Sequence, residues 1–263
     1  MLNNYSMGLM TWQEYADALS ENCVAFLPCG ALEQHGPHLP MATDAIFAEA
    51  MATNTAQRLA KQMKTLVLPT LGYGYKSQAR SGGGQTFVGT TSLDGATLTH
   101  TVLDIIRELA RHGLQRLVIV DGHYENQWFI TEAIELAMRE LAYGKQTMQV
   151  LRCEYWDYCP QAVLDEIFAG DFPGMDLEHA ALIETSMMLA LHPEWVRTDK
   201  IPANDQAHFV QHDHYPQDGS GVPASGVLAP AGNASADKGR RIIDATTEHM
   251  AQAFQQAFVA GEG

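Results

Sequence analysis

Four short, largely apolar runs alternate along this chain with longer segments in which apolar residues recur at helical spacing. The runs are VAFL (24–27), LVLP (66–69), LVIV (117–120) and MQVL (148–151). Strands of this kind are typical of a parallel sheet with both faces covered, and the helices between them supply the crossovers that parallel strands need. The alternation therefore predicts an α/β fold built around a mainly parallel sheet.

Helix signals stand between these runs. Thr11 and Glu14 in TWQE have the spacing of a capping box, which predicts a short helix after Thr11. Asp94 and Asn126 precede apolar residues at helical spacing, so each is predicted to open a helix. Further helices are expected from Asp44 onward, over 160–169, over 180–191 and from about 235 to 258.

The charge of the chain narrows the class of partner. The 263 residues carry a net charge of −15, and the sequence contains no linker, repeat or low-complexity tract, so we expect a single domain over 1–263. Proteins that bind nucleic acid need a basic face, which this balance opposes. The composition therefore indicates a protein that acts on small molecules.

Compartment signals favour the cytoplasm. The amino terminus lacks a basic start followed by an apolar core, so no signal peptide is expected. No run of about 18 apolar residues occurs, so no membrane-spanning helix is expected either. The four cysteines are Cys23, Cys29, Cys153 and Cys159. They show no CxxC spacing and are interpreted as reduced, mostly buried thiols.

Acidic residues and histidines follow two of the predicted strands. Glu33 and His35 come just after the first strand, and His123 and Glu125 come just after the third. In an extended backbone, residues i and i+2 point to the same side, so each pair can reach one space. Ligands of open α/β sheets collect outside the carboxyl ends of the strands. Asp44, at the head of the next predicted helix, can enter the same space.

Two interpretations of this set remain open at this point. Nitrogen and oxygen ligands suit Zn²⁺ or Mn²⁺, and five ligands suit two ions that share one carboxylate, for which Asp44 is the natural candidate. Alternatively, these are loop residues that cap helix ends and satisfy one another by hydrogen bonding.

Two loops raise questions of their own. The Gly-rich stretch 72–92 lies after the second strand, and it is interpreted as a substrate-side loop because no Walker pattern accompanies its glycines. The stretch 193–234, rich in Pro, Gly and polar residues, is either an arm that packs on another subunit or a surface excursion. Its three histidines, in HFVQHDH (208–214), are interpreted as part of a solvated loop.

Four separated blocks resemble the creatininase (creatinine amidohydrolase) family. They are GALEQHGPHLPMATD, YGYKSQARSGGGQTFVGTTSLDGATL, DGHYEN and DLEHAALIETS, in this order, and the match runs from about Thr11 to Leu191. The resemblance implies a three-layer α/β/α sandwich around a mainly parallel sheet, assembled as a homo-oligomer, often a hexamer. It also implies a site for two divalent metal ions, Zn²⁺ and/or Mn²⁺.

The resemblance further implies roles for residues of this chain. One ion takes Glu33, Asp44 and His123, and the other takes His35, Asp44 and Glu125. The implied substrate pocket is lined by Ser81, Tyr124, Trp156, Met175 and Asp176. His179 is the implied proton carrier, with Glu178 beside it. Met175 departs from the family pattern, which has GWDIEH where this chain has GMDLEH, and a thioether lacks the broad flat face of an indole.

The activity that follows from the resemblance is hydrolysis of a cyclic amide, with creatinine and water giving creatine in a reversible reaction. The departure at Met175 leaves open a related hydrolase that acts on a formamide or on a cyclic polyol ketone such as an inosose derivative. A third interpretation, of another class, is a metal-binding module without catalysis.

Overall fold

A computed structural model describes residues 5–78, 81 and 83–260 of the chain. Four parallel strands form its sheet, in the order β2-β1-β3-β4. Their bounds are Val24–Cys29 (β1), Thr65–Val67 (β2), Arg116–Asp121 (β3) and Gln149–Glu154 (β4). Cys29 at the end of β1 is in register with Asp121 at the end of β3, so the two loops that carry the predicted ligands leave the same edge of the sheet.

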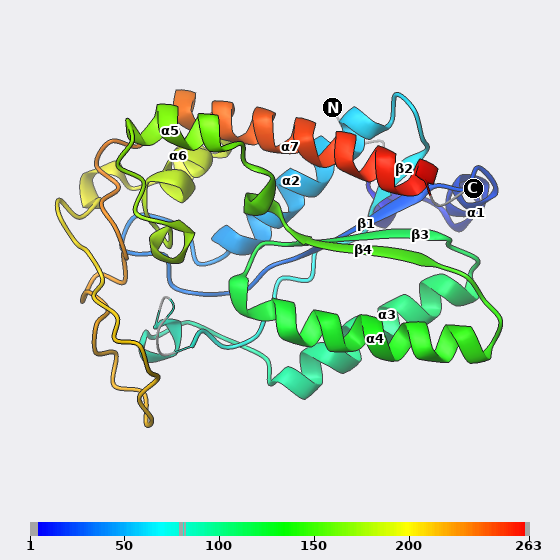
Figure 1. The fold of residues 1–263 in the computed structure, drawn as a ribbon, viewed down its shortest axis with the longest axis horizontal. Coiled ribbons are helices and arrows are strands. Elements are labelled where there is room, and N and C mark those ends of the chain that lie inside the picture. The colour runs from blue at the N-terminus through cyan, green and yellow to red at the C-terminus, as the bar shows by residue number, and fades with distance from the viewer. Residues whose placement is uncertain (1–4, 79–80, 82, 261–263) are drawn as a thin grey trace.

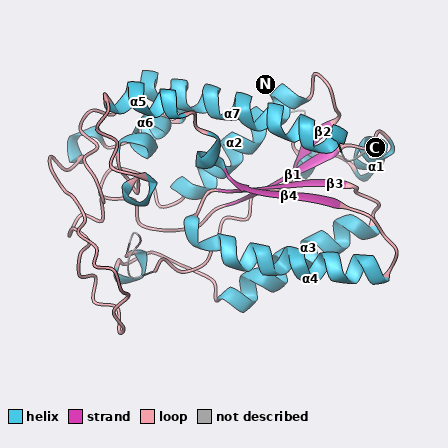
Figure 2. Cartoon of the chain, viewed as in Figure 1, coloured by secondary structure: helices cyan, strands magenta, loops and turns pink. Residues whose placement is uncertain are grey.

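Helices cover both faces of this sheet (Figures 1 and 2). One layer holds α2 (Thr43–Leu59), α5 (Gln161–Phe168), α6 (Leu182–Leu191) and α7 (Ala236–Ala260). The other holds α3 (Gly95–Arg111) and α4 (Gln127–Tyr143), and α1 (Trp12–Ser20) packs into the same cluster. The expected three-layer α/β/α architecture is therefore confirmed.

Side-chain alternation along the strands builds the two cores. Phe26 of β1 packs into the cluster that contains Phe47 and Phe254, whereas its neighbour Leu27 joins the cluster on the opposite face with Ile106. Successive residues of a strand point to opposite faces, so a strand that is apolar throughout serves both layers. All six residues of β1 are buried, which is why its sequence shows no polar alternation.

Helix starts agree with the predictions only in part. Thr11 and Glu14 form the expected capping box at α1. Asp94 precedes α3, but its carboxylate pairs with the Lys76 ammonium instead of capping the helix. Asn126 holds the N-cap position of α4, which begins at Gln127 after a 3-10 turn over Tyr124–Asn126 (η3), so the predicted helix start is confirmed, but its side chain makes no capping hydrogen bond. In both cases a long-range polar partner competes for the side chain that would cap the helix.

Short 3-10 turns occupy several of the connections. They are η1 (Met7–Leu9), η2 (Gly84–Thr86), η4 (Tyr155–Tyr158), η5 (Met175–Leu177), η6 (Pro193–Trp195) and η7 (Thr198–Lys200). Residues 193–234, hereafter the arm, join α6 to α7 and contain η6 and η7 as their only helices. Figure 1 shows the arm in yellow and orange, at the end of the molecule where the loops of the sheet edge gather.

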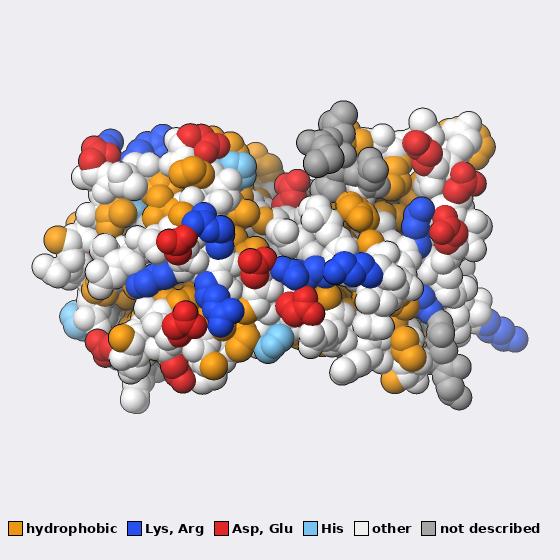
Figure 3. All heavy atoms as spheres, turned by 90° about the horizontal axis from the view of Figure 1, so that it is seen from above, with side chains coloured by type: hydrophobic (Ala, Val, Ile, Leu, Met, Phe, Trp, Pro, Cys, Tyr) orange, Lys and Arg blue, Asp and Glu red, His pale blue; other side chains and the backbone are white. Residues whose placement is uncertain are grey.

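The distribution of surface charge and the character of the helices both bear on the expected partners. Figure 3 shows basic and acidic side chains interspersed, with no broad patch of either sign on this face. Arg58 of α2, for example, pairs with Asp244 and Glu248 of α7 at 2.8 and 3.0 Å. Among the described residues, no helix is both long and apolar enough to cross a membrane.

Candidate metal centre and substrate cavity

The ends of β1 and β3 bring five predicted ligands together. Glu33 and His35 follow β1, His123 and Glu125 follow β3, and Asp44 lies in the first turn of α2. Each of the five is at most 4% exposed. Burying carboxylates costs free energy unless positive charge or hydrogen bonds compensate. Several charged or polar side chains whose burial is unfavourable without compensation are therefore gathered at this edge of the sheet.

Three of these residues form a first group of possible metal ligands. Glu33, Asp44 and His123 each offer an atom, and these atoms all lie within 4.8 Å of one another. His123 Nδ1 lies 3.0 Å from Asp44 Oδ2 and 3.3 Å from Glu33 Oε2. This grouping has the same membership as the first ion site that the resemblance implies.

A second group surrounds His35. Its members are His35, His179 and Glu184, again with ligand atoms within 4.8 Å of one another. His35 Nε2 lies 2.9 Å from Asp44 Oδ1 and 3.7 Å from Glu184 Oε2. Asp44 therefore turns one oxygen toward each group.

Glu125 lies beside the first group, with its Oε2 atom 3.3 Å from His123 Nε2. Its other oxygen, Oε1, accepts hydrogen bonds from the hydroxyl of Ser81 and from the backbone N–H of Gln78, the latter at 3.1 Å. The resemblance implies Glu125 as a partner of His35, whereas Glu184 stands next to His35 in the structure. The sequence signal for Glu184 was only its closeness along the chain to His179.

Two buried atoms test whether cations fit here. Asp44 Oδ2 and His35 Nε2 make no hydrogen bond, although each lies 3.0 Å or less from an oppositely polar atom of the site. Since buried polar atoms in folded proteins nearly always make hydrogen bonds, atoms that approach one another without one suit a cation bound between them. Imidazole nitrogens and carboxylate oxygens are the donors that Zn²⁺ and Mn²⁺ accept. The residues present therefore fit divalent cations.

In the second group, the pKa values of His35 and His179 are shifted in opposite directions. Burial alone would lower the pKa of His35, but the carboxylates of Asp44 and Glu184 outweigh it and raise that pKa to about 10. Burial and the nearby charge of His35 lower the pKa of His179 to about 4. The ring centroids of the two histidines are 4.3 Å apart. His179 is therefore a neutral imidazole near neutral pH and can accept a proton.

A buried amide holds the loops of the site in place. Asn126 Nδ2 donates to the carbonyl of Gly30 and to Asp121 Oδ1, both at 3.1 Å, and Asn126 Oδ1 accepts from the N–H of Tyr75 at 2.8 Å. Close backbone approach adds to this: a Cβ on Gly122 would lie 2.5 Å from the carbonyl oxygen of Asp44. The loops after β1, β2 and β3 are thus tied to one another directly behind the ligands.

Gln34 forms a second junction, which no pattern in the sequence indicates. Its Nε2 atom donates to the carbonyl of Gly226 in the arm at 3.0 Å, and its own carbonyl lies 2.8 Å from His179 Nε2. Its side-chain oxygen accepts from the N–H of Gly36 at 2.9 Å. One residue next to two ligands therefore contacts both the His179 loop and the arm.

His38 lies close to the ligands in sequence but has a structural environment. It is fully buried, and its Nε2 atom lies 2.9 Å from Thr185 Oγ1 in the first turn of α6. Burial lowers its pKa to about 4, so the ring is neutral. The hydrogen bond fixes the ligand loop against the helix that carries Glu184.

Above the ligand groups lies a cavity of about 620 Å³. All the residues that the sequence analysis assigned to substrate or proton transfer line it: Ser81, Tyr124, Trp156, Met175, Asp176, Glu178 and His179. Other residues that no sequence pattern had assigned to the pocket also line it, among them Trp128, Tyr155, Phe209 and Asp213. Tyr124 and Trp128 meet edge to face, with ring centroids 5.9 Å apart, and form one aromatic wall.

Glu178 differs in detail from its expected place beside His179. Its Oε2 atom accepts a hydrogen bond of 2.7 Å from the N–H of Ile183 at the start of α6, and its Oε1 atom is buried without a hydrogen bond. Burial raises its pKa to about 8. Among the hydrogen bonds described, none joins Glu178 to His179, so Glu178 faces the cavity as a separate group.

The Gly-rich loop lies over the ligands, as expected of a substrate-side loop. The hydroxyl of Ser77 donates to Glu33 Oε1, while Ser81 and Gln78 contact Glu125. A Cβ on Gly84 would collide with the Glu33 carboxylate, so the backbone approaches the site closely there. Residues 79, 80 and 82 lie outside the described part of the chain.

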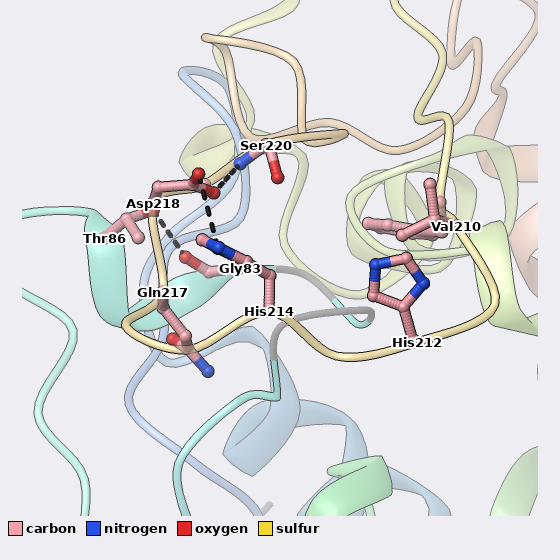
Figure 4. Close-up of a pocket in the computed structure, with 10 residues that line it drawn as sticks. Gly83, Thr86, Val210, His212, His214, Gln217, Asp218 and Ser220 are labelled. Atoms are coloured by element: carbon pink, nitrogen blue, oxygen red, sulfur yellow. Dashed lines mark hydrogen bonds and ion pairs between the residues drawn. The ribbon is translucent and has the colours of Figure 1, made fainter.

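The arm tip forms a small hollow against the Gly-rich loop (Figure 4). His214 and Asp218 approach each other at 3.6 Å beside Gly83 and Thr86, whereas His212 points away from this pair. Among the described residues, no metal-type cluster involves the arm histidines.

Comparison with known proteins shows which family and which relatives this chain resembles. The family model for creatininase, described as creatinine amidohydrolase, matches residues 8–254. The chain is 46% identical to creatinine amidohydrolase of Pseudomonas putida over 261 residues, which is 98% of this chain and 99% of that protein. It is 34% identical to the mycofactocin precursor peptide peptidase of Mycobacterium tuberculosis, over 84% of this chain and 80% of that protein.

Solved structures agree with the sequence match. A manganese form of creatininase superposes with a TM-score of 0.93, and a glutamate-to-glutamine mutant of creatininase in complex with creatine superposes with a TM-score of 0.92. Each of these two structures is 46% identical to this chain. Each superposition covers 97% of this chain and 98% of the solved one. A Zn-Zn form of that mutant has the same identity and coverage, with a TM-score of 0.92.

Proposed function

The chain belongs to the creatininase family, and from that premise we propose that it hydrolyses the cyclic amide creatinine to creatine. The observation that carries the proposal is the position of Asp44, with one carboxylate oxygen toward each of two buried ligand groups at the floor of the cavity. The full-length likeness to a creatinine amidohydrolase, and the likeness to a creatininase complexed with creatine, support the substrate.

Two divalent ions per chain, Zn²⁺ and/or Mn²⁺, are part of this proposal. Glu33, Asp44 and His123 would hold one ion, and His35 and Asp44 would begin the second site. Glu184 is the carboxylate beside His35 there, and Glu125, which the family pattern implies as the third ligand, lies beside His123. Likeness to manganese and Zn-Zn forms of creatininase supports the choice of metals. When bound, such ions supply a water of lowered pKa and polarise an amide carbonyl.

The residues of the chain then have distinct tasks. The aromatic side chains of Tyr124, Trp128 and Trp156 line the walls and suit a flat five-membered ring. Ser81 and Asp176 offer polar groups along the same cavity and suit the exocyclic nitrogen of the substrate. Holding the ring in one orientation above the ligand groups lowers the activation free energy, because the reacting atoms are already positioned when the substrate binds.

Proton transfer completes the reaction. The oxygen of water forms a bond to the carbonyl carbon, and the ring C–N bond breaks with its electron pair moving to nitrogen. That nitrogen needs a proton to leave, and the water must lose one. His179 is neutral and lies in the second ligand group, so we assign it the role of carrying this proton. The same carrier serves the reverse reaction.

The decisive assay combines turnover with metal analysis. Purified protein reconstituted with Zn²⁺ or Mn²⁺ is assayed for creatine release from creatinine, and bound metal is counted by elemental analysis. We expect turnover together with close to two ions per chain. Absence of creatinine turnover in fully metallated protein would overturn the proposed substrate, and activity on a formamide or an inosose derivative would then assign the alternative. Fewer than one ion per chain would favour a binding module.

The proposal also includes the oligomeric state of the protein and its location in the cell. We expect one domain over 1–263, working as a cytoplasmic homo-oligomer, a hexamer by resemblance to the family. Cys23, Cys29 and Cys153 are buried free thiols, which supports a reducing compartment. Light scattering coupled to size-exclusion chromatography measures the assembly directly, and a monomer at micromolar concentration would contradict it.

A further inference from the structure

The arm contributes one wall of the substrate cavity. Phe209 and Asp213 belong to the arm, and both line the cavity together with residues of the α/β body. Phe209 is half-buried, whereas the next residue, Val210, is 58% exposed and does not line this cavity. Both residues line the small hollow at the arm tip, but of the two only Phe209 also lines the substrate cavity.

Backbone hydrogen bonds fix the base of the arm to the proton carrier. The N–H of Leu228 donates to the carbonyl of His179 at 3.1 Å, and the N–H of Ala207 donates to the carbonyl of Leu228 at 2.8 Å. One residue further, the N–H of His208 donates to the carbonyl of Gly221 at 2.9 Å. Phe209 therefore follows directly after two backbone anchors, the first of which leads back to His179.

The tip of the arm is fastened to the Gly-rich loop, whose residues Gln78 and Ser81 also line the cavity. The Tyr215 hydroxyl donates a hydrogen bond of 3.2 Å to Gln78 Oε1, and Gln78 in turn donates its backbone N–H to Glu125. Close packing supports this contact, because a Cβ on Gly83 would lie 2.7 Å from Val222 Cγ2 of the arm. Figures 1 and 4 show the arm beside the Gly-rich loop.

The chemistry of the cavity gives Phe209 its task. The floor is acidic, and Met175 adds a flexible thioether to the lining where a flat face would hold a ring more firmly. The substrate of the proposed reaction is a flat ring with an N-methyl group, which an aromatic side chain covers well. Resting on the proposed function, we propose that Phe209 is a specificity-determining residue that packs against the substrate ring, and that the Tyr215–Gln78 hydrogen bond holds it there.

The test compares neighbouring residues on the same arm. Phe209→Ala should raise KM for creatinine about tenfold, the effect of losing a well-packed apolar contact, while kcat and metal content stay within about twofold of wild type. Phe209→Tyr keeps the ring and should stay near the wild-type KM. Val210→Ala is the matched control and should leave KM and kcat unchanged.

A second variant tests the fastening without altering the cavity wall. Tyr215→Phe removes only the hydroxyl that reaches Gln78, and it should raise KM about threefold, the effect of a hydrogen bond of modest net strength. An unchanged KM in Phe209→Ala, with active wild type, would overturn the inference and leave the proposed function intact. Parallel loss of kcat and bound metal in Phe209→Ala would mean a purely structural role and would also overturn it. A wild type without creatinine turnover would instead contradict the proposed function, and this inference with it.

Discussion

Asn126 Nδ2 donates a hydrogen bond of 3.1 Å to the carbonyl of Gly30, and this joins the loop after β3 to the end of β1. The same amide reaches Asp121 and Tyr75. Two strands that are distant in sequence are therefore held at a fixed offset immediately behind the ligands. The ligand groups depend on this offset because Glu33 comes from one loop and His123 from the other.

Asn126→Ala should destabilise the fold by about 2–3 kcal/mol, because it leaves several buried polar groups without partners. Urea denaturation followed by circular dichroism gives the free energy of unfolding. Gln127→Ala is the control: its amide makes an exposed hydrogen bond to the carbonyl of Tyr124, so its effect should stay within about 0.5 kcal/mol. Equal effects of the two substitutions would show that the junction is unimportant.

Glu125→Gln should lower turnover at least about 100-fold while the fold survives, because a neutral amide replaces a negative charge beside the ligands. Turnover, metal content and melting temperature are measured on the same preparation. The exposed residue Glu132, on α4, provides the control substitution Glu132→Gln, which should be silent. Near-normal turnover in Glu125→Gln would contradict its assigned role.

His179→Ala should reduce kcat by about 10²- to 10⁴-fold, the usual contribution of a proton carrier, and should reduce metal content far less. His35, His179 and Glu184 form one group, so a ligand role would produce a different result, namely loss of metal in parallel with activity. His192→Ala, at the end of α6, removes a histidine away from the site and should change neither quantity.

Glu178 makes the stability of the metal-free protein depend on pH. Burial raises its folded-state pKa to about 8 from the ordinary value of 4.5, so the native state holds this proton more tightly than the unfolded chain does. Its contribution to stability is then fully present below about pH 4.5 and is lost as the pH rises through 8. The expected loss is on the order of a few kcal/mol.

Urea denaturation of chelator-treated protein between pH 5 and 9 measures this dependence. Glu178→Gln keeps the shape of the side chain and removes the titration, so its free energy of unfolding should fall less steeply over this range. Identical slopes for wild type and variant would show that Glu178 titrates normally.

The elements of the sheet were predictable because their signal is local. An apolar run such as LVIV specifies a doubly buried strand without reference to the rest of the chain, and the structure places β3 over it. That Glu33 and His123 lie at one edge of the sheet was also predictable, because parallel strands end at the same edge, whereas their grouping with Asp44 in one ion site was implied only by the family resemblance. Asp94 failed as a cap because Lys76 reaches it from another loop, which no local pattern reveals.

The parts of the site that escaped prediction depend on contacts between distant segments. Phe209 lies in a stretch without periodicity, and only the folded arm brings it to the cavity. Gln34 looked like a spacer between two ligands, yet its side chain meets Gly226, 192 positions away. Such contacts follow from the path of the loops, on which composition and spacing carry no information.

The anchoring of Leu228 to the carbonyl of His179 has a consequence for how relatives of this protein diverge. The carbonyl of Leu228 also accepts from the N–H of Ala207, so the two ends of the segment 207–228 are held together at this anchor, and a tip of different length grafted between them would leave the histidine where it is. Changes at the tip of the arm would therefore alter the cavity wall, to which Phe209 and Asp213 contribute, and leave the ligands at the floor in place.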